Sequence, residues 1–161
     1  MSKLASVSPA DDATAPALLS EKPSWLISQI STHAHRLLTE RLATVGMRGY
    51  HFRLLAALEE FGPASQASLG RRTDMDRSDV AAAITELTDQ KLAERVTDQA
   101  DRRRNIISIT ASGRARLRRL DNLLIGVQDE LLTPLSPGER RALVGMLSRV
   151  LDYLGSSQTP N

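Results

Sequence analysis

The sequence contains no cysteine, and this absence excludes several kinds of chemistry. A chain without cysteine forms no disulfide, holds no metal through thiolates and has no thiol redox switch. It also lacks a glycine-rich phosphate loop after a strand, a nucleophile elbow and a histidine–carboxylate metal motif. We therefore expect neither an enzyme nor a protein that needs a cofactor.

Aromatic residues are scarce, at 3% of the chain, and no long apolar run is present. A core made mostly of Leu, Ile, Val and Ala favours packed helices over a large β-sandwich. With 161 residues, the chain has room for one domain or for one small module flanked by association helices.

No window reaches the apolar length that spans a bilayer, and residues 1–19 lack a signal-peptide pattern. We expect no membrane association and a cytoplasmic location.

The net charge is only +2, from 21 Lys and Arg against 19 Asp and Glu, so the totals do not indicate the partner. The distribution is more informative. Between Asp98 and Arg119 the only acidic residues are Asp98 and Asp101, whereas arginine is frequent. The arginines in this stretch are Arg102, Arg103, Arg104, Arg114, Arg116, Arg118 and Arg119. This concentration predicts a basic surface.

Long amphipathic helices are predicted near both ends of the chain. From Trp25 to Val45 apolar residues recur at helical spacing, and Gly46 follows as a stop. Ser136-Pro137-Gly138-Glu139 has the pattern of a capping box, and apolar residues then recur at helical spacing up to Leu154. The stretch before Pro23 mixes Ser, Ala, Pro and Asp without a period, which predicts a mobile tail.

The middle of the chain has the pattern of a helix-turn-helix followed by a hairpin. After a helix that ends near Gly62-Pro63, a short helix is predicted over about residues 65–73. Asp76 is a good N-cap for a further helix to about Gln90, and Asp79 completes that cap. Residues 93–96 and 106–109 resemble two strands around a polar loop, and Thr110 then caps a long helix.

These patterns together predict a mainly α fold with a small β-hairpin wing. We divide the chain into a mobile N-terminal tail (1–23), a winged helix-turn-helix (47–110), a helical dimerisation region (24–46 plus 111–155) and a mobile C-terminal tail (156–161). The helices on either side have two interpretations, packing within one chain or packing against a second copy. We favour a two-fold dimer, because a single winged module does not need such long flanking helices.

Residues 98–113, D-Q-A-D-R-R-R-N-I-I-S-I-T-A-S-G, resemble the wing signature of the MarR family of bacterial transcriptional regulators. The resemblance is strongest over residues 65–113 and looser over 25–154. It implies a homodimer that binds double-stranded DNA at a pseudo-palindromic operator, most commonly as a repressor. Within the wing it implies that Arg103 enters the minor groove, that Asp101 orients it, and that Arg102 and Arg104 contact phosphates.

Physical chemistry supports the same role for the wing, because an arginine at a narrow hairpin tip suits the negative potential of a minor groove. The alternative is that these arginines only solvate a loop. On the recognition helix, the residues off the apolar face are Arg77, Ser78, Ala81, Ala82 and Thr85, and we expect them to face the major groove. Because this set is poor in basic residues, the wing and phosphate contacts should supply much of the affinity.

A ligand site is predicted from the scarce aromatic and imidazole residues near the first two long helices. The candidates are Trp25, His33, Arg36, Arg48, Tyr50 and His51. By resemblance, a small aromatic acid would stack on Trp25 or Tyr50 while an arginine meets its carboxylate. The alternative is that these aromatic side chains fill core or dimer contacts.

Two other functions stay open from the sequence. The first is a winged module that binds protein in place of DNA. The second is a zinc-responsive regulator of the same fold. His33 and His35 diverge on a helix and are poorly placed to share a metal, although His51 could join one of them.

Overall fold

The computed structural model describes residues 15–97 and 105–157. The chain divides into two compact units, residues 1–37 and 38–161. The first holds α1 (Ala17–Ser20) and the start of α2 (Pro23–Ala43), which ends in the second unit. The sequence predicted a mobile tail over residues 1–23, whereas the structure has the helical turn α1 within this stretch. The Pro16 carbonyl closes this turn by accepting the N–H groups of Leu19 and Ser20 at 2.8 and 3.1 Å. Residues 1–14 lie outside the described stretches.

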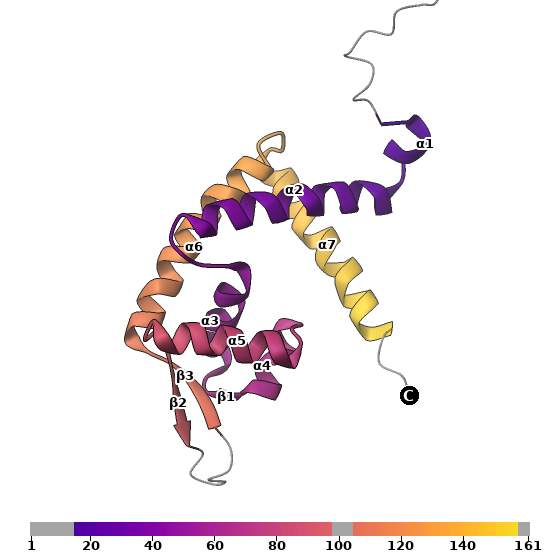
Figure 1. Cartoon of the computed structure of the whole chain (residues 1–161). Coiled ribbons are helices and arrows are strands. Elements are labelled where there is room, and N and C mark those ends of the chain that lie inside the picture. The colour runs from indigo at the N-terminus through magenta and orange to yellow at the C-terminus, as the bar shows by residue number, and fades with distance from the viewer. Residues whose placement is uncertain (1–14, 98–104, 158–161) are drawn as a thin grey trace, which may run out of the picture. The chain divides into compact units, whose positions relative to one another are not determined.

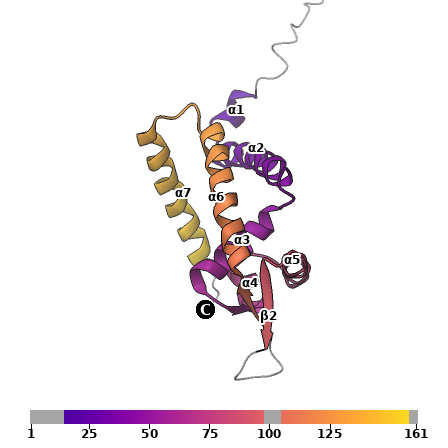
Figure 2. The same ribbon diagram turned by 90° about the vertical axis from the view of Figure 1, so that its left-hand side faces the viewer.

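The second unit is built mostly of helices around a small sheet. Its elements are α3 (Gly49–Phe61), β1 (Ala64–Ser65), α4 (Gln66–Thr73), α5 (Arg77–Asp89), β2 (Ala93–Thr97), β3 (Asn105–Ile109), α6 (Ala111–Leu131) and α7 (Pro137–Ser157). Figures 1 and 2 show α3, α4, α5 and the sheet gathered at one end of α6, with the β2–β3 hairpin projecting from this lobe. The predicted fold class, mainly α with a β-hairpin wing, is confirmed.

Three predicted helix starts are confirmed by their hydrogen bonds. The Asp76 carboxylate accepts the N–H of Asp79 at 2.9 Å, and the Thr110 hydroxyl oxygen accepts the N–H of Gly113 at 3.0 Å. At α7 the N–H of Ser136 donates to Glu139 at 2.8 Å, while the N–H of Glu139 donates to the Ser136 hydroxyl oxygen at 3.4 Å. Each cap satisfies a backbone donor that the first helical turn leaves free.

The end of α7 differs from the sequence-based division, which begins a mobile tail at residue 156. The helix continues through Ser157, and the Ser156 hydroxyl donates to the Tyr153 carbonyl at 2.9 Å. This bond satisfies one of the carbonyls that a helix C-terminus leaves without a partner. Residues 158–161 lie outside the described stretches.

The sheet has a third strand that the sequence pattern did not predict. Its order is β1-β3-β2, all antiparallel, with Ala64 opposite Ile107 and Ala93 opposite Ile109. Ser65 therefore ends β1 and is the N-cap of α4, where its hydroxyl oxygen accepts the N–H of Ser68 at 3.2 Å. β1 ties the central strand of the hairpin to the start of the helix-turn-helix.

Aliphatic side chains fill the core of the second unit. Large side chains from α3, α5, β3 and α6 are exposed by 1% or less, among them Leu54, Leu55, Ile84, Ile107 and Leu120. α3 lies at the centre and packs against α4, α5, α6 and β3. Burial of such a Leu or Ile side chain contributes about 1.5–3 kcal/mol. This core holds the helix-turn-helix and the base of the hairpin in one rigid lobe.

The first turn of α6 lies directly against the chain that leads into β2. A Cβ atom built on Gly113 would lie 2.0 Å from the Leu92 carbonyl oxygen. The same carbonyl accepts the N–H of Thr110 at 3.1 Å. Because only glycine permits this approach, Gly113 fixes the base of the hairpin to α6.

α7 carries an apolar stripe that its own chain leaves exposed. Val144, Met146, Leu147, Val150, Leu151 and Leu154 are each exposed by 46–70%. A contiguous apolar surface of this kind is typical of an interaction site. In the stretches 15–97 and 105–157, no helix combines the length and apolar character needed to cross a bilayer.

Candidate nucleic-acid interface and effector site

α4 and α5 form the helix-turn-helix, and the turn between them is fixed by local hydrogen bonds. Asp74 follows α4 in the left-handed conformation, with φ of 50°, and the N–H of Met75 donates to the Gly70 carbonyl at 3.0 Å. Asp76 then caps α5, and its pKa is lowered because it accepts the N–H of Asp79 and the Ser78 hydroxyl. The N-terminus of α5 is therefore well defined.

The outer face of α5 is formed by five residues predicted from the sequence to face DNA. Val80, Ala83, Ile84 and Leu87 are buried against the core. Arg77, Ser78, Ala82 and Thr85 are exposed, and Ala81 is half-buried. The geometry thus brings this set onto one solvent-facing surface, with Arg77 as its only basic member.

Arg95 is an additional basic residue beside this face, and it comes from the hairpin. Its guanidinium donates to the Thr85 hydroxyl at 3.0 Å, and that hydroxyl donates in turn to the Ala81 carbonyl at 2.9 Å. β2 and the outer face of α5 are therefore joined by a chain of two hydrogen bonds. The predicted wing-tip residues, Asp101, Arg102, Arg103 and Arg104, lie outside the described stretches.

A second cluster joins the start of α3 to α5 through Glu86. The Glu86 carboxylate accepts the Tyr50 hydroxyl at 3.2 Å and lies 2.9 Å from His51 Nε2. The N–H of Arg48 donates to His51 Nδ1 at 3.2 Å, which requires that nitrogen to be unprotonated. His51 Nε2 therefore carries the proton and donates it to Glu86.

Protonation in this cluster follows from burial. The His51 side chain is only 2% exposed, and burial lowers its pKa from 6.5 although Glu86 opposes the shift. Burial, with Glu86 as the next cause, raises the pKa of Tyr50 from 10.0. The Arg48 guanidinium lies 5.8 Å from the centre of the Tyr50 ring. At neutral pH, Tyr50 and His51 are thus two neutral hydrogen-bond donors aimed at one carboxylate.

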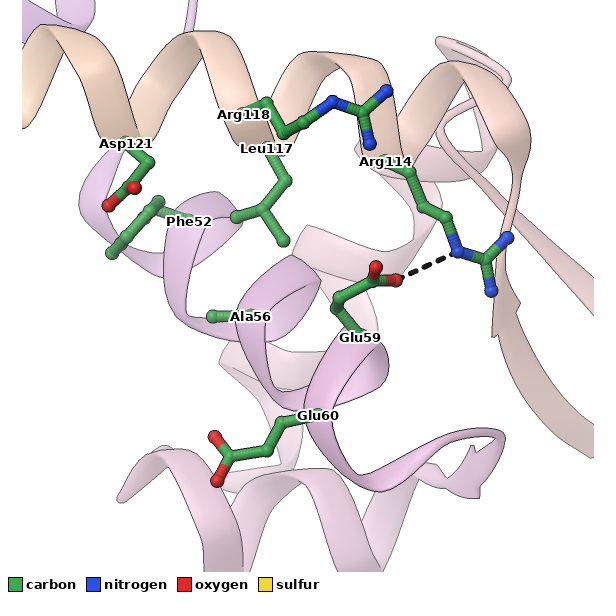
Figure 3. Close-up of a pocket in the computed structure, with 8 residues that line it drawn as sticks. All are labelled: Phe52, Ala56, Glu59, Glu60, Arg114, Leu117, Arg118 and Asp121. Atoms are coloured by element: carbon green, nitrogen blue, oxygen red, sulfur yellow. Dashed lines mark hydrogen bonds and ion pairs between the residues drawn. The ribbon is translucent and has the colours of Figure 1, made fainter.

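A groove lies between α3 and α6 (Figure 3). Its volume is about 330 Å³. Phe52, Ala56 and Leu117 supply an apolar lining, and an ion pair of 2.8 Å joins Glu59 to Arg114 at its edge. Glu60, Arg118 and Asp121 complete the lining. None of these residues was predicted as a ligand contact from the sequence.

The histidines were also candidates for a metal site. Within residues 15–97 and 105–157, no group of three or more His, Asp or Glu side chains comes together in a way that could hold a metal ion. His51 is instead occupied on both ring nitrogens, by the Arg48 N–H and by Glu86.

Comparison with known proteins relates this architecture to a family. Residues 45–104 match the model of the MarR family. Over this stretch the chain is similar to the MarR family of transcriptional regulators, whose members are not enzymes.

Proteins similar to this chain include regulators and a solved structure. A putative transcriptional regulatory protein for the hcr operon of Thauera aromatica is 28% identical over 134 residues, 83% of this chain and 77% of that protein. The HTH-type transcriptional repressor NicR of Pseudomonas putida is 31% identical over 101 residues, 63% of this chain and 64% of NicR. BpsR from Bordetella bronchiseptica, whose structure addresses the regulation of its DNA binding by 6-hydroxynicotinic acid, matches with a TM-score of 0.74 and 25% identity over 86% of this chain and 99% of BpsR.

The six ligand candidates fall into two groups in the structure. Arg48, Tyr50 and His51 come together around Glu86. Trp25, His33 and Arg36 lie on the part of α2 that belongs to the first unit, and they stay predictions. Sequence reasoning missed Glu86, because its partners Tyr50 and His51 are distant in the sequence. It also missed Arg95, because the sequence of β2 does not indicate that this side chain reaches α5.

Proposed function

We propose that this chain is a homodimeric, sequence-specific DNA-binding repressor that a small aromatic acid releases from DNA. The observation that best supports DNA binding is the outer face of α5, where Thr85 is hydrogen-bonded to Arg95 of the hairpin. A helix of this kind enters the major groove, and its N-terminal residues contact base edges. Arg77 is the strongest base reader on the face, since arginine pairs with guanine in a bidentate manner.

The wing is proposed to supply much of the remaining affinity. β2 and β3 lead directly to residues 98–104, which carry Asp101, Arg102, Arg103 and Arg104. We assign Arg103 to the minor groove, Asp101 to its orientation, and Arg102 and Arg104 to phosphates. Arg95 adds positive charge in the middle of β2 in the same hairpin. The affinity should therefore fall steeply with salt concentration.

A second copy of the chain is the proposed partner for the apolar stripe on α7. Six aliphatic or methionine side chains there stay at least 46% exposed in one protomer. Pairing two such stripes removes them from water and brings two recognition helices onto one duplex. Recognition helices in such dimers lie about 34 Å apart, one turn of DNA, which suits a pseudo-palindromic operator.

The proposed effector is a small aromatic acid. Support comes from the donors Tyr50 and His51 and the cation of Arg48 at the start of α3. Trp25, His33 and Arg36 remain candidates for further contacts. The likeness to BpsR, whose structure addresses 6-hydroxynicotinic acid, supports the same chemical class.

Selection of bound duplexes from a random pool tests the proposal directly. We expect the full-length protein to recover a pseudo-palindrome. On that duplex, Arg103→Ala should weaken binding more than Arg77→Ala and should lower the slope of log affinity against log salt by about one. Arg141→Ala, which removes an exposed arginine from α7, is the matched control and should leave affinity unchanged.

The same experiment separates the rival functions. A winged module that binds protein would show no salt-dependent duplex affinity to lose when Arg103 is replaced. A zinc-responsive regulator would bind or release its duplex when zinc is added or chelated, and the proposal here expects no response. Recovery of no common sequence would contradict the proposal of a sequence-specific regulator.

A further inference from the structure

We infer that Tyr50 and His51 form a carboxylate-binding site whose resident occupant is Glu86, and that an effector carboxylate acts by taking the place of Glu86. This inference rests on the proposed function and deepens it. The effector's carboxylate would accept the same two hydrogen bonds that the Glu86 carboxylate accepts in the structure.

The donors suit a carboxylate because both are neutral and fixed. His51 is held in one tautomer by the Arg48 N–H, so its Nε2 proton points at Glu86. The rings of Tyr50 and His51 meet edge to face, with centres 4.4 Å apart, and this packing restricts both side chains. An incoming carboxylate accepts charge-assisted hydrogen bonds from these two neutral donors.

Burial explains why the site can exchange occupants. The His51 side chain is 2% exposed, so its donor would be left unsatisfied at a substantial free-energy cost if Glu86 simply left. The Glu86 side chain is 44% exposed, so its carboxylate can turn away from the donors and be hydrated by solvent. Replacement of Glu86 by another carboxylate is therefore favoured over an empty site.

The exchange would reach DNA because Glu86 belongs to the recognition helix. Its bonds to Tyr50 and His51 tie the outer part of α5 to the start of α3. Glu86 is also the next residue after Thr85, which holds Arg95. When an effector occupies the donors, α5 loses this polar tie to the start of α3 and keeps only the packing of its buried face.

Calorimetric titration of the full-length chain with benzoate tests the inference. Glu86→Gln weakens the internal competitor, because an amide oxygen accepts these bonds less strongly than a carboxylate. We expect benzoate to bind this variant about tenfold more tightly than the wild type. Asp89→Asn removes the same charge from an exposed position on the same helix and should leave the affinity at the wild-type value.

Further arms identify the site itself. Tyr50→Phe removes one donor and should weaken benzoate binding by about threefold to tenfold, and benzamide, which lacks the carboxylate, should not bind. Arg118→Ala, in the groove between α3 and α6, should have no effect. Equal affinities of wild type and Glu86→Gln, loss of binding in Arg118→Ala, or no benzoate binding to any form would overturn the inference. Duplex binding measured without benzoate reports separately on the proposed function.

Discussion

The guanidinium of Arg95 on β2 donates a hydrogen bond to the hydroxyl of Thr85 on α5, 3.0 Å away. One residue belongs to the hairpin and the other to the outer face of the recognition helix. The two elements proposed to enter adjacent grooves of DNA are thus connected outside the hydrophobic core. Thr85 is oriented from both sides, because its hydroxyl also donates to the Ala81 carbonyl.

Replacement of Arg95 tests whether this connection matters for DNA. We expect Arg95→Ala to weaken binding to the selected duplex by about threefold to tenfold, since an exposed charge-assisted hydrogen bond and a nearby cation are lost. Thr85→Val removes the acceptor. If the two residues act as one unit, the double variant should bind no worse than Arg95→Ala in an electrophoretic mobility assay. Strictly additive losses would show that they act independently.

Gly113 offers a stability test with a matched control on the same helix. Gly113→Ala places a Cβ 2.0 Å from the Leu92 carbonyl oxygen, so the backbone must shift, and we expect a loss of about 1–3 kcal/mol. Gly126→Ala meets nothing within 4 Å and should stabilise α6 by about 0.5–1 kcal/mol. Thermal denaturation should therefore move the two melting temperatures in opposite directions. A Gly113→Ala protein as stable as the wild type would contradict the close approach.

The sequence was most informative where structure is local. The caps at Asp76, Thr110 and Ser136 were predicted because each bond joins residues three apart. The contacts that were missed join distant residues. Ala64 pairs with Ile107 in a two-residue strand too short to show a period. His51 meets Glu86 across 35 residues, and only the packing of α3 on α5 brings them together.

A charge placed in the α7 stripe should prevent dimer formation. Leu151 is 70% exposed in one protomer, so Leu151→Asp should leave the monomer fold intact while it disrupts burial against a second copy. We expect a dimer for the wild type and a monomer for this variant in sedimentation velocity, with loss of binding to the full palindrome. Ser148→Asp is the control, because it adds the same charge at an exposed polar position of α7. A dimeric Leu151→Asp protein would show that another surface holds the two copies together.

The buried imidazole of His51 predicts a loss of stability in acid. Burial lowers its pKa below 6.5 in the folded protein, so the unfolded chain binds a proton more readily. His51 therefore contributes its full stability above about pH 6.5, and this stability is lost as the pH falls through the lower pKa of the folded state. In melting curves between pH 7.5 and 5, His51→Gln should decline less steeply than the wild type. His33→Gln, which removes an exposed histidine, should follow the wild-type curve.

α6 makes a series of polar contacts along its length, all within the second unit. Glu130 pairs with Arg41 of α2 at 2.8 Å, Arg116 donates to the Val45 carbonyl at 3.2 Å, and Arg114 pairs with Glu59 of α3. At its first turn, Gly113 rests on the backbone that enters β2. α6 is thus tied to α2, to α3 and to the base of the hairpin, so a rotation of α6 would move the helix-turn-helix and the hairpin together.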